Sequence, residues 1–267
     1  MVPRLAPCTI LVLCLGVPLP GPAMDAPASG GGTRSWIGRW GDYEESLRTA
    51  PIQRIEDIGQ GVTKPRRAFF SPDAVAASAC VKVLPRKRLK GFWESYQSEV
   101  AAYALDRVLG LDMVPVTVER RIEGDRASVQ LWIDGTRLLS DVGSEVPPRP
   151  HEWARQVRRQ RVFDALIANI DRNAGNMLVD EDWNMILIDH SRAFMKNETP
   201  FLDRITAVDR QLYEAVKALD EATLNEHLSP WLFGKGSVKD LLKRRDRIVE
   251  KLEKLAAERG AAAVFPP

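Results

Sequence analysis

Cysteine is scarce in this chain of 267 residues, which has three, and two of them, Cys8 and Cys14, fall within the first 14 residues. Beyond that stretch only Cys80 remains, so it has no partner for an internal disulfide bond. The count excludes the disulfide-dense small domains of secreted proteins. The three histidines are scattered and, with Cys80, give no spacing typical of a zinc site.

An excess of charge of one sign is also missing. The chain has 38 Lys and Arg against 36 Asp and Glu, a net charge of +2. Proteins that bind nucleic acid or anionic membrane surfaces usually carry a marked basic excess, so the balance predicts no nucleic-acid partner. Long apolar runs are absent too, and the run at residues 9–17 is far shorter than the roughly 20 residues that span a bilayer. We therefore expect no transmembrane helix.

The N-terminus resembles an export signal. Arg4 precedes the apolar run, and the small residues Gly21, Pro22 and Ala23 follow it, which predicts a secretory signal peptide over residues 1–23. The expected location is then periplasmic or secreted; if Met24 is the true start, it is cytoplasmic. Residues 24–45 begin with a stretch rich in Gly, Ala, Pro and Ser, which predicts a flexible linker.

The pattern of the remaining chain predicts an α+β fold in two lobes. Short apolar stretches broken by Gly and Pro predict strands over residues 52–83, and three- and four-residue spacing predicts a helix from Phe92 to a stop at Gly110. A hairpin follows at 114–133, then helices, a second hairpin at 177–189 and a helix over 212–224. We expect a β-rich lobe with one main helix at 46–134, a mainly helical lobe at 135–260 and a tail at 261–267.

The residues that indicate chemistry lie between positions 169 and 194. Asp171 and Asn176 are five apart, the spacing of the Asp and Asn in a kinase catalytic loop, where one accepts the proton of the acceptor hydroxyl and the other binds a metal. Asp189 ends an apolar strand that returns beside Asn176. Mg²⁺ prefers oxygen ligands, including one or two protein carboxylates, so this set suits phosphoryl transfer. The plainer alternatives are a structural ion pair of Asp171 with Arg172 at a helix end, and a half-buried hairpin that ends at Asp189.

The upstream half of the chain contains candidates for binding the nucleotide phosphates, which such a site also needs. Lys82 lies in an apolar strand, and Glu99, 17 residues later, falls on the predicted helix, which matches a phosphate-binding lysine held by a helix carboxylate. Gly59 and Gly61 flank a turn between two predicted strands, where backbone amides could approach a phosphate. A Gly-x-Gly alone is weak evidence, and a plain turn explains it equally well.

Five segments together resemble one superfamily: GQGVTKP, VKVLP, SEVAAYALDRVLGLDMVPVT, FDALIANIDRNAGN and LIDHSRAF. In this order they are similar to the atypical kinases that include phosphatidylinositol 3- and 4-kinases, HipA-type bacterial kinases and the Golgi kinases of the secretory pathway. The resemblance covers residues 52–250. The helix segment is most similar to the secretory-pathway kinases, and the last two segments to lipid-kinase signatures.

This resemblance implies a two-lobed protein-kinase-like fold and a role for each marked residue. Asp171 would be the catalytic residue, Lys82 and Glu99 the ion pair, and Asn176 and Asp189 the metal ligands. Residues 130–134, with Gln130 and Trp132, would form the interlobe hinge near adenine. Two positions depart from the pattern: Asn173 stands where lipid kinases usually have His, and Ser191 stands where Gly usually follows the metal-binding Asp.

The expected function follows from the resemblance and the residues together. We expect a kinase of the phosphatidylinositol 3-/4-kinase-like superfamily that uses ATP with Mg²⁺ or Mn²⁺ and transfers the γ-phosphate to a hydroxyl of a protein, lipid or small-molecule substrate. The first alternative is a nucleotide-binding pseudokinase or regulatory module without turnover. The second is a metal-dependent phosphohydrolase using the same acids, which has no evident need for the Lys82–Glu99 pair.

Overall fold

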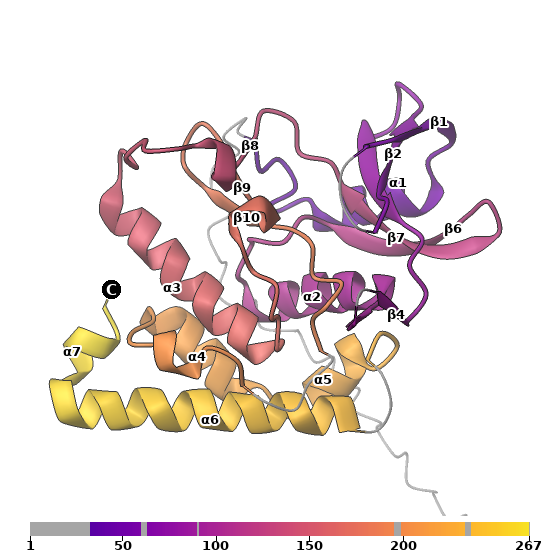
Figure 1. The fold of residues 1–267 in the computed structure, drawn as a ribbon. Coiled ribbons are helices and arrows are strands. Elements are labelled where there is room, and N and C mark those ends of the chain that lie inside the picture. Colours follow the sequence, from indigo (N-terminus) through magenta and orange to yellow (C-terminus); the bar gives the residue numbers. More distant parts are fainter. Residues whose placement is uncertain (1–32, 60–62, 90, 195–198, 233–235, 267) are drawn as a thin grey trace, which may run out of the picture.

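The computed structural model describes residues 33–59, 63–89, 91–194, 199–232 and 236–266. The expected signal peptide, residues 1–23, lies outside the described residues. The described chain is α+β, with a β-rich N-terminal lobe beside a mainly helical C-terminal lobe (Figure 1). The predicted fold class is confirmed by this arrangement.

The N-terminal lobe is built on an antiparallel sheet of five strands in the order β1-β2-β3-β7-β6. The strands are β1 (Ile52–Asp57), β2 (Arg66–Phe70), β3 (Ser78–Lys82), β6 (Thr117–Ile122) and β7 (Asp125–Leu131). Only Glu123 and Gly124 connect β6 to β7, and both have positive φ, 53° and 93°. Two such residues form the type I′ turn, whose twist matches that of the flanking strands. The predicted hairpin is therefore present.

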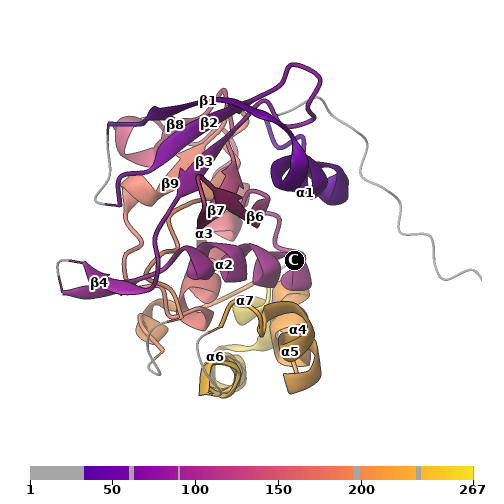
Figure 2. The same cartoon turned by 90° about the vertical axis from the view of Figure 1, so that its right-hand side faces the viewer.

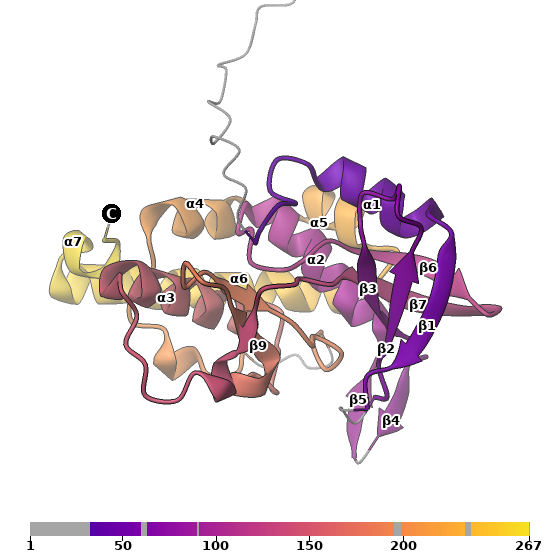
Figure 3. The same cartoon turned by 90° about the horizontal axis from the view of Figure 1, so that it is seen from above.

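Helix α2 (Tyr96–Leu109) packs against β6 and β7 and separates the sheet from the C-terminal helices (Figure 1). The Ser95 side chain caps its start by accepting the N–H of Gln97 at 3.1 Å. Gly110, at φ +58°, ends it in the left-handed conformation that glycine adopts easily. A small hairpin of β4 (Lys87–Leu89) and β5 (Phe92–Glu94) precedes the helix and projects from the lobe (Figures 2 and 3).

The C-terminal lobe starts with a small sheet and a long helix. Strands β8 (Arg137–Leu138), β9 (Met177–Val179) and β10 (Met185–Leu187) form a three-stranded sheet in the order β10-β9-β8. Helix α3 (Pro150–Leu166) begins with a proline, which suits the first helical turn because its missing N–H would have no partner there. The 3₁₀ turns η1 (Leu139–Asp141) and η2 (Ala174–Asn176) connect these elements.

The rest of the lobe is helical. After the 3₁₀ turn η3 (Leu202–Arg204), the helices are α4 (Arg210–Ala218), α5 (Glu221–Leu228), α6 (Gly236–Arg259) and α7 (Ala261–Val264). Helix α6 runs along the base of the lobe (Figure 1). Its buried Arg244 donates from Nε to the carbonyl of Leu166 at 2.6 Å and so joins α6 to the end of α3.

The structure differs from the sequence expectations at the two ends of the described chain. The expected linker 24–45 contains the fully buried Trp36 and the first turns of helix α1 (Trp40–Thr49). Burial of an indole ring is a strong apolar contribution, so this part packs on the lobe. The expected tail 261–267 contains α7, and the Val264 carbonyl accepts the N–H of Val208 at 2.9 Å.

Two predicted helices also have different limits. The helix expected from Phe92 begins at Tyr96, because the preceding residues pair with β4 as strand β5. The single helix expected over 212–224 is two helices, α4 and α5. Asp220 caps the second one by accepting the N–H of Thr223 at 2.8 Å. No helix in the described residues combines the length and the apolar character needed to cross a membrane.

Candidate active site

A cleft of about 810 Å³ is lined by residues of both lobes. From the N-terminal lobe, strand β3 contributes Cys80 and Lys82, which share one face of the strand because they are two residues apart. From the C-terminal lobe, Asn176 and Asp189 contribute to the lining. Burial raises the pKa of the Cys80 thiol to about 11, which keeps it neutral near pH 7 and does not favour a role as nucleophile.

Lys82 makes the central contact between the lobes. Its Nζ donates to Glu99 Oε1 at 2.5 Å and to Asp189 Oδ1 at 2.9 Å. The first partner comes from α2 and the second from the segment after β10, so three separate elements meet at one ammonium group. The structure therefore brings together three of the residues marked in the sequence. The Lys82 and Glu99 side chains are 9% and 2% exposed, which makes theirs a buried pair.

Burial acts against both charges of this pair, and their attraction outweighs it. Burial alone would lower the pKa of Lys82, but the carboxylates of Asp189 and Glu99 hold it well above the usual range. Burial alone would raise the pKa of Glu99, but the neighbouring Lys82 ammonium holds it well below the usual range. Both groups are therefore charged at neutral pH. The second Glu99 oxygen accepts the backbone N–H of His190 at 2.9 Å, which ties α2 to the residue after Asp189.

The hairpin β9–β10 sets Asn176 beside Asp189. Its register pairs Met177 with Leu187, and the Ile188 N–H donates to the Asn176 carbonyl at 3.2 Å. Asn176 ends the turn before β9, and Asp189 comes directly after Ile188, so antiparallel pairing brings the two together. Asp189 has φ +57°, a left-handed conformation that Asp tolerates better than most residues. The Ser191 hydroxyl, at a departure from the family pattern, donates to Asp189 Oδ1 at 3.1 Å.

Asp171 lies in the loop between α3 and η2, and it is not among the described residues that line the cleft. Its backbone carbonyl accepts the Asn176 side-chain amide at 2.9 Å. Its carboxylate forms an ion pair, Oδ2 to Arg192 Nη1, at 2.9 Å. Asn173, the other departure, accepts the Gly175 N–H at 2.8 Å and donates to the Asp171 carbonyl at 2.9 Å, so it shapes the loop.

Arg172, which the sequence suggested only as an ion-pair partner within the loop, holds this loop in place. Its Nε is 3.0 Å from Asp164 Oδ2 in a buried ion pair, and it donates to the carbonyls of Asn176 and Ile188, the latter at 2.8 Å. Its Nη2 is 2.8 Å from His190 Nε2. Burial lowers the pKa of His190, which favours a neutral ring whose Nε2 accepts from Arg172. The presence of an arginine inside the DRNAGN segment was the sequence signal that could have indicated this role.

Replacement of Arg172 by methionine should destabilise the protein by about 3–5 kcal/mol, because it leaves the buried Asp164 carboxylate without its counterion. Urea unfolding at pH 7 measures the change. The double variant Arg172→Met with Asp164→Asn should recover part of the loss, since the unpaired charge is then gone. A single variant as stable as the wild type, or a double variant with no recovery, contradicts this role for the ion pair.

The predicted hinge residues lie at the cleft, and the glycine turn is described only in part. Gln130 and Trp132 line the cleft, and Gln130 donates to Thr117 Oγ1 at 2.9 Å. Gly59 has φ +72° and follows the lining residue Ile58, whereas Gly61 lies outside the described residues. The adenine and phosphate roles of these residues stay predictions.

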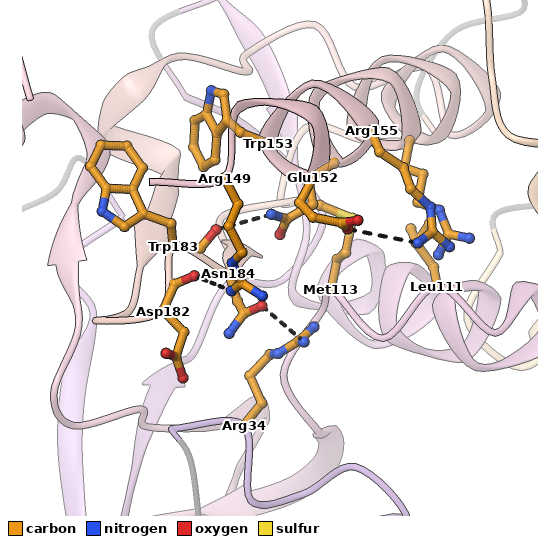
Figure 4. A pocket seen from close by; sticks show the side chains of 12 residues that line it. Arg34, Leu111, Met113, Arg149, Glu152, Trp153, Arg155, Asp182, Trp183 and Asn184 are labelled. Atoms are coloured by element: carbon orange, nitrogen blue, oxygen red, sulfur yellow. Dashed lines mark hydrogen bonds and ion pairs between the residues drawn. The ribbon is translucent and has the colours of Figure 1, made fainter. Parts of the chain in front are cut away.

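A second, smaller cavity of about 140 Å³ is lined by residues of the β9–β10 turn and of helix α3, among others (Figure 4). Arg34 reaches into it and donates to Asn184 Oδ1 at 3.1 Å, and Trp153 meets Trp183 edge to face at 5.5 Å. Other arginines also line the cavity, and Arg159 forms an ion pair with Asp209 at 2.7 Å. Burial lowers the pKa of Arg34, and the carboxylates of Asp180 and Asp112 offset part of this effect. Carboxylates of the protein itself thus lie beside Arg159 and Arg34, and we assign this cavity no ligand.

Comparison with known structures shows which proteins share this fold. The chain is similar to the crystal structure of the Golgi casein kinase, with 18% identity over 85% of this chain and 78% of that one and a TM-score of 0.63. It is similar to hydra Fam20 with sugar, with 14% identity over 83% of this chain and 90% of that one and a TM-score of 0.64. The Helicobacter pylori proinflammatory kinase CtkA matches with 14% identity over 80% and 96% and a TM-score of 0.53. The chain therefore has the fold of the atypical kinases.

The solved structures named above share this fold and are of Fam20-type kinases and of CtkA. The Golgi casein kinase has also been solved with Mn/ADP bound. No protein-family model matches the sequence, and no curated protein is similar to it at a significant level. The phosphatidylinositol 3-/4-kinase and HipA parts of the sequence resemblance stay predictions.

Proposed function

We propose that this protein is an ATP- and metal-dependent phosphotransferase that passes the γ-phosphate to a hydroxyl group. The observation that carries the proposal is the position of Lys82, in the wall of the cleft and in contact with both Glu99 and Asp189. Kinases use a strand lysine held by a helix glutamate to bind nucleotide phosphates, with a nearby aspartate on the metal. The similarity in fold to Golgi casein kinase and Fam20 supports it.

The residues present fit a Mg²⁺ or Mn²⁺ ion. Asp189 offers a carboxylate, 34% exposed, and Asn176 offers its amide oxygen because its amide nitrogen is used by the Asp171 carbonyl. The described residues contain no cluster of three His, Cys, Asp or Glu side chains that could hold a metal alone. Mg²⁺ commonly has one or two protein carboxylates and completes its shell with phosphate oxygens and water. When bound, the ion neutralises charge on the phosphates. The Mn/ADP complex of the Golgi casein kinase supports the proposal.

The protein's own side chains would then have separate roles in binding the nucleotide and in transferring the proton. Lys82 binds phosphate oxygens and is oriented by Glu99, so its long side chain needs little reordering when nucleotide binds. Asp171, in the loop that also carries Asn176, accepts the proton of the attacking hydroxyl. Gln130 and Trp132 line the nucleotide end of the cleft. The acceptor is proposed as a class only: a hydroxyl of a protein, a lipid or a small molecule.

Incubation with ATP labelled in its γ-phosphate tests the proposal. The protein is given Mg²⁺ or Mn²⁺ together with protein, lipid and small-molecule acceptor fractions, and the label is followed into each. Label in an acceptor fraction is the expected result, and it should disappear when the metal is chelated. A thermal shift with ATP but no transfer identifies a nucleotide-binding module instead. Release of inorganic phosphate alone, without labelled acceptor, identifies a phosphohydrolase. Either of these last two results overturns the proposal.

A further inference from the structure

The segment that follows Asp189 lies along the beginning of helix α2. The Ser95 N–H donates to the Ser191 carbonyl at 2.9 Å, and the Ser98 hydroxyl donates to the Ala193 carbonyl at 2.9 Å. Glu99 accepts the His190 N–H from the same segment. The first turn of α2 and residues 190–193 are therefore bound together along their length, and Arg192 lies within this contact.

The Arg192 side chain connects two carboxylates that come from different lobes. Its Nε and Nη2 lie 2.9 Å and 2.8 Å from Glu94 Oε1, in β5 of the N-terminal lobe. Its Nη1 lies 2.9 Å from Asp171 Oδ2, in the C-terminal lobe. The guanidinium also stacks over the Phe92 ring at 4.6 Å. The Arg192 side chain is 16% exposed and that of Glu94 is 1% exposed, so this ion pair is shielded from water, whereas the Asp171 side chain is 37% exposed.

The geometry of the guanidinium makes this connection directional. Two of its nitrogens bind one Glu94 oxygen, and the ring of Phe92 limits its rotation, so the planar group presents the third nitrogen to Asp171. That contact fixes one oxygen of the Asp171 carboxylate. The other oxygen, Oδ1, makes no hydrogen bond or ion pair within the described part of the chain and is left to accept a proton. A general base needs its oxygen held within hydrogen-bond reach of the proton it takes.

We propose that Arg192 is a positioning residue for the proposed phosphotransfer: it holds the Asp171 carboxylate toward the acceptor hydroxyl and makes that placement depend on β5 and the start of α2. The inference rests on the proposed function. Helix α2 and strand β5 then link the metal site, the phosphate site and the catalytic loop. The contacts that make this link are those of Asp189, Lys82, Glu99 and Arg192. Displacement of α2 would loosen the lysine contact and the aspartate contact together.

Replacement of Arg192 by lysine tests the inference, because lysine keeps the charge and loses the planar fork. We expect kcat to fall about 10²-fold, the size of effect that a small misplacement of a reacting group produces. The KM for ATP and the affinity for ADP with Mn²⁺ should stay at wild-type values, since Arg192 does not line the cleft. Arg39→Lys is the matched control, because it makes the same substitution in an arginine–carboxylate pair of 3.0 Å at an exposed site.

A second set of variants tests the inference even if Arg192→Lys fails to fold. Arg192→Ala leaves the buried Glu94 unpaired, so it is made together with Glu94→Gln, and added guanidinium ion should restore part of its kcat. In an Asp171→Asn background, Arg192→Lys should cause no further loss, because the group it positions is already absent. Wild-type kcat in Arg192→Lys, a loss that falls on KM, or an equal loss in the Asp171→Asn background overturns the inference.

Failure of the inference and failure of the proposed function give different results. If the wild-type protein transfers label and the Arg192 variants do so equally well, the inference alone is wrong. If the wild-type protein transfers no label to any acceptor fraction, the proposed function is wrong and the positioning role falls with it.

Discussion

Replacement of Asp189 by asparagine is expected to lower metal-dependent phosphoryl transfer by about 10³-fold, the loss typical of removing a group that stabilises charge in the transition state. The change keeps the size of the side chain and removes the carboxylate that would bind the metal and contacts Lys82. Glu99 remains as a partner for Lys82, so the fold should persist. Initial rates over a range of Mg²⁺ and Mn²⁺ concentrations, with thermal unfolding of the same samples, measure both effects.

The matched control is Asp182→Asn, which makes the same substitution at an exposed position in the turn of the same hairpin. It should transfer phosphate at the wild-type rate and unfold at the wild-type temperature. Transfer by Asp189→Asn at the rate of this control would remove Asp189 from the metal site. A loss of rate with a matching loss of folded protein would show a structural role only.

Replacement of Asp171 by asparagine is expected to lower transfer to the acceptor by about 10²- to 10⁴-fold, the usual contribution of a general base. Asparagine cannot take the hydroxyl proton, although its shape is nearly unchanged. Nucleotide and metal binding should stay intact, since the contact between the Asp171 loop and Asn176 uses the backbone carbonyl of residue 171. Rates with saturating acceptor, together with titration of ADP and Mn²⁺, separate the two effects.

Asp203→Asn, at an exposed position in the 3₁₀ turn η3, is the control for this second variant and should behave as the wild type. An Asp171→Asn protein that still transfers phosphate at the wild-type rate would show that Asp171 is not the base. Weaker nucleotide binding in the variant would instead place Asp171 in the binding of the substrate.

Much of the site could be predicted because its residues keep a fixed order along the chain. Lys82, Glu99 and Asp189 were marked by their order and element types, and the structure brings them to one point. The β6–β7 hairpin was predictable because Gly124 lies at the turn and turn chemistry is local. Element types follow from such short-range patterns of apolar spacing and turn residues.

Contacts that depend on the assembled lobes could not be predicted. Arg192 meets Glu94 across 98 residues of chain, and nothing in either local pattern marks the other as its partner. Arg172 acts through backbone carbonyls that come together only when β9 and β10 pair. The start of α2 was misplaced because the spacing of Phe92 and Tyr96 also suits a helix, whereas pairing with β4 makes Phe92 part of a strand. The break between α4 and α5 had a local signal, the helix-capping side chain of Asp220, but the apolar spacing continues across it and so predicted a single helix.

A crystal structure of the protein with Mn²⁺ and a non-hydrolysable ATP analogue tests the central claim most directly. The account predicts the nucleotide in the interlobe cleft, phosphate oxygens beside Lys82, and the metal on the side-chain oxygens of Asn176 and Asp189. Nucleotide bound outside the cleft, or a metal held without either of those two residues, would contradict it.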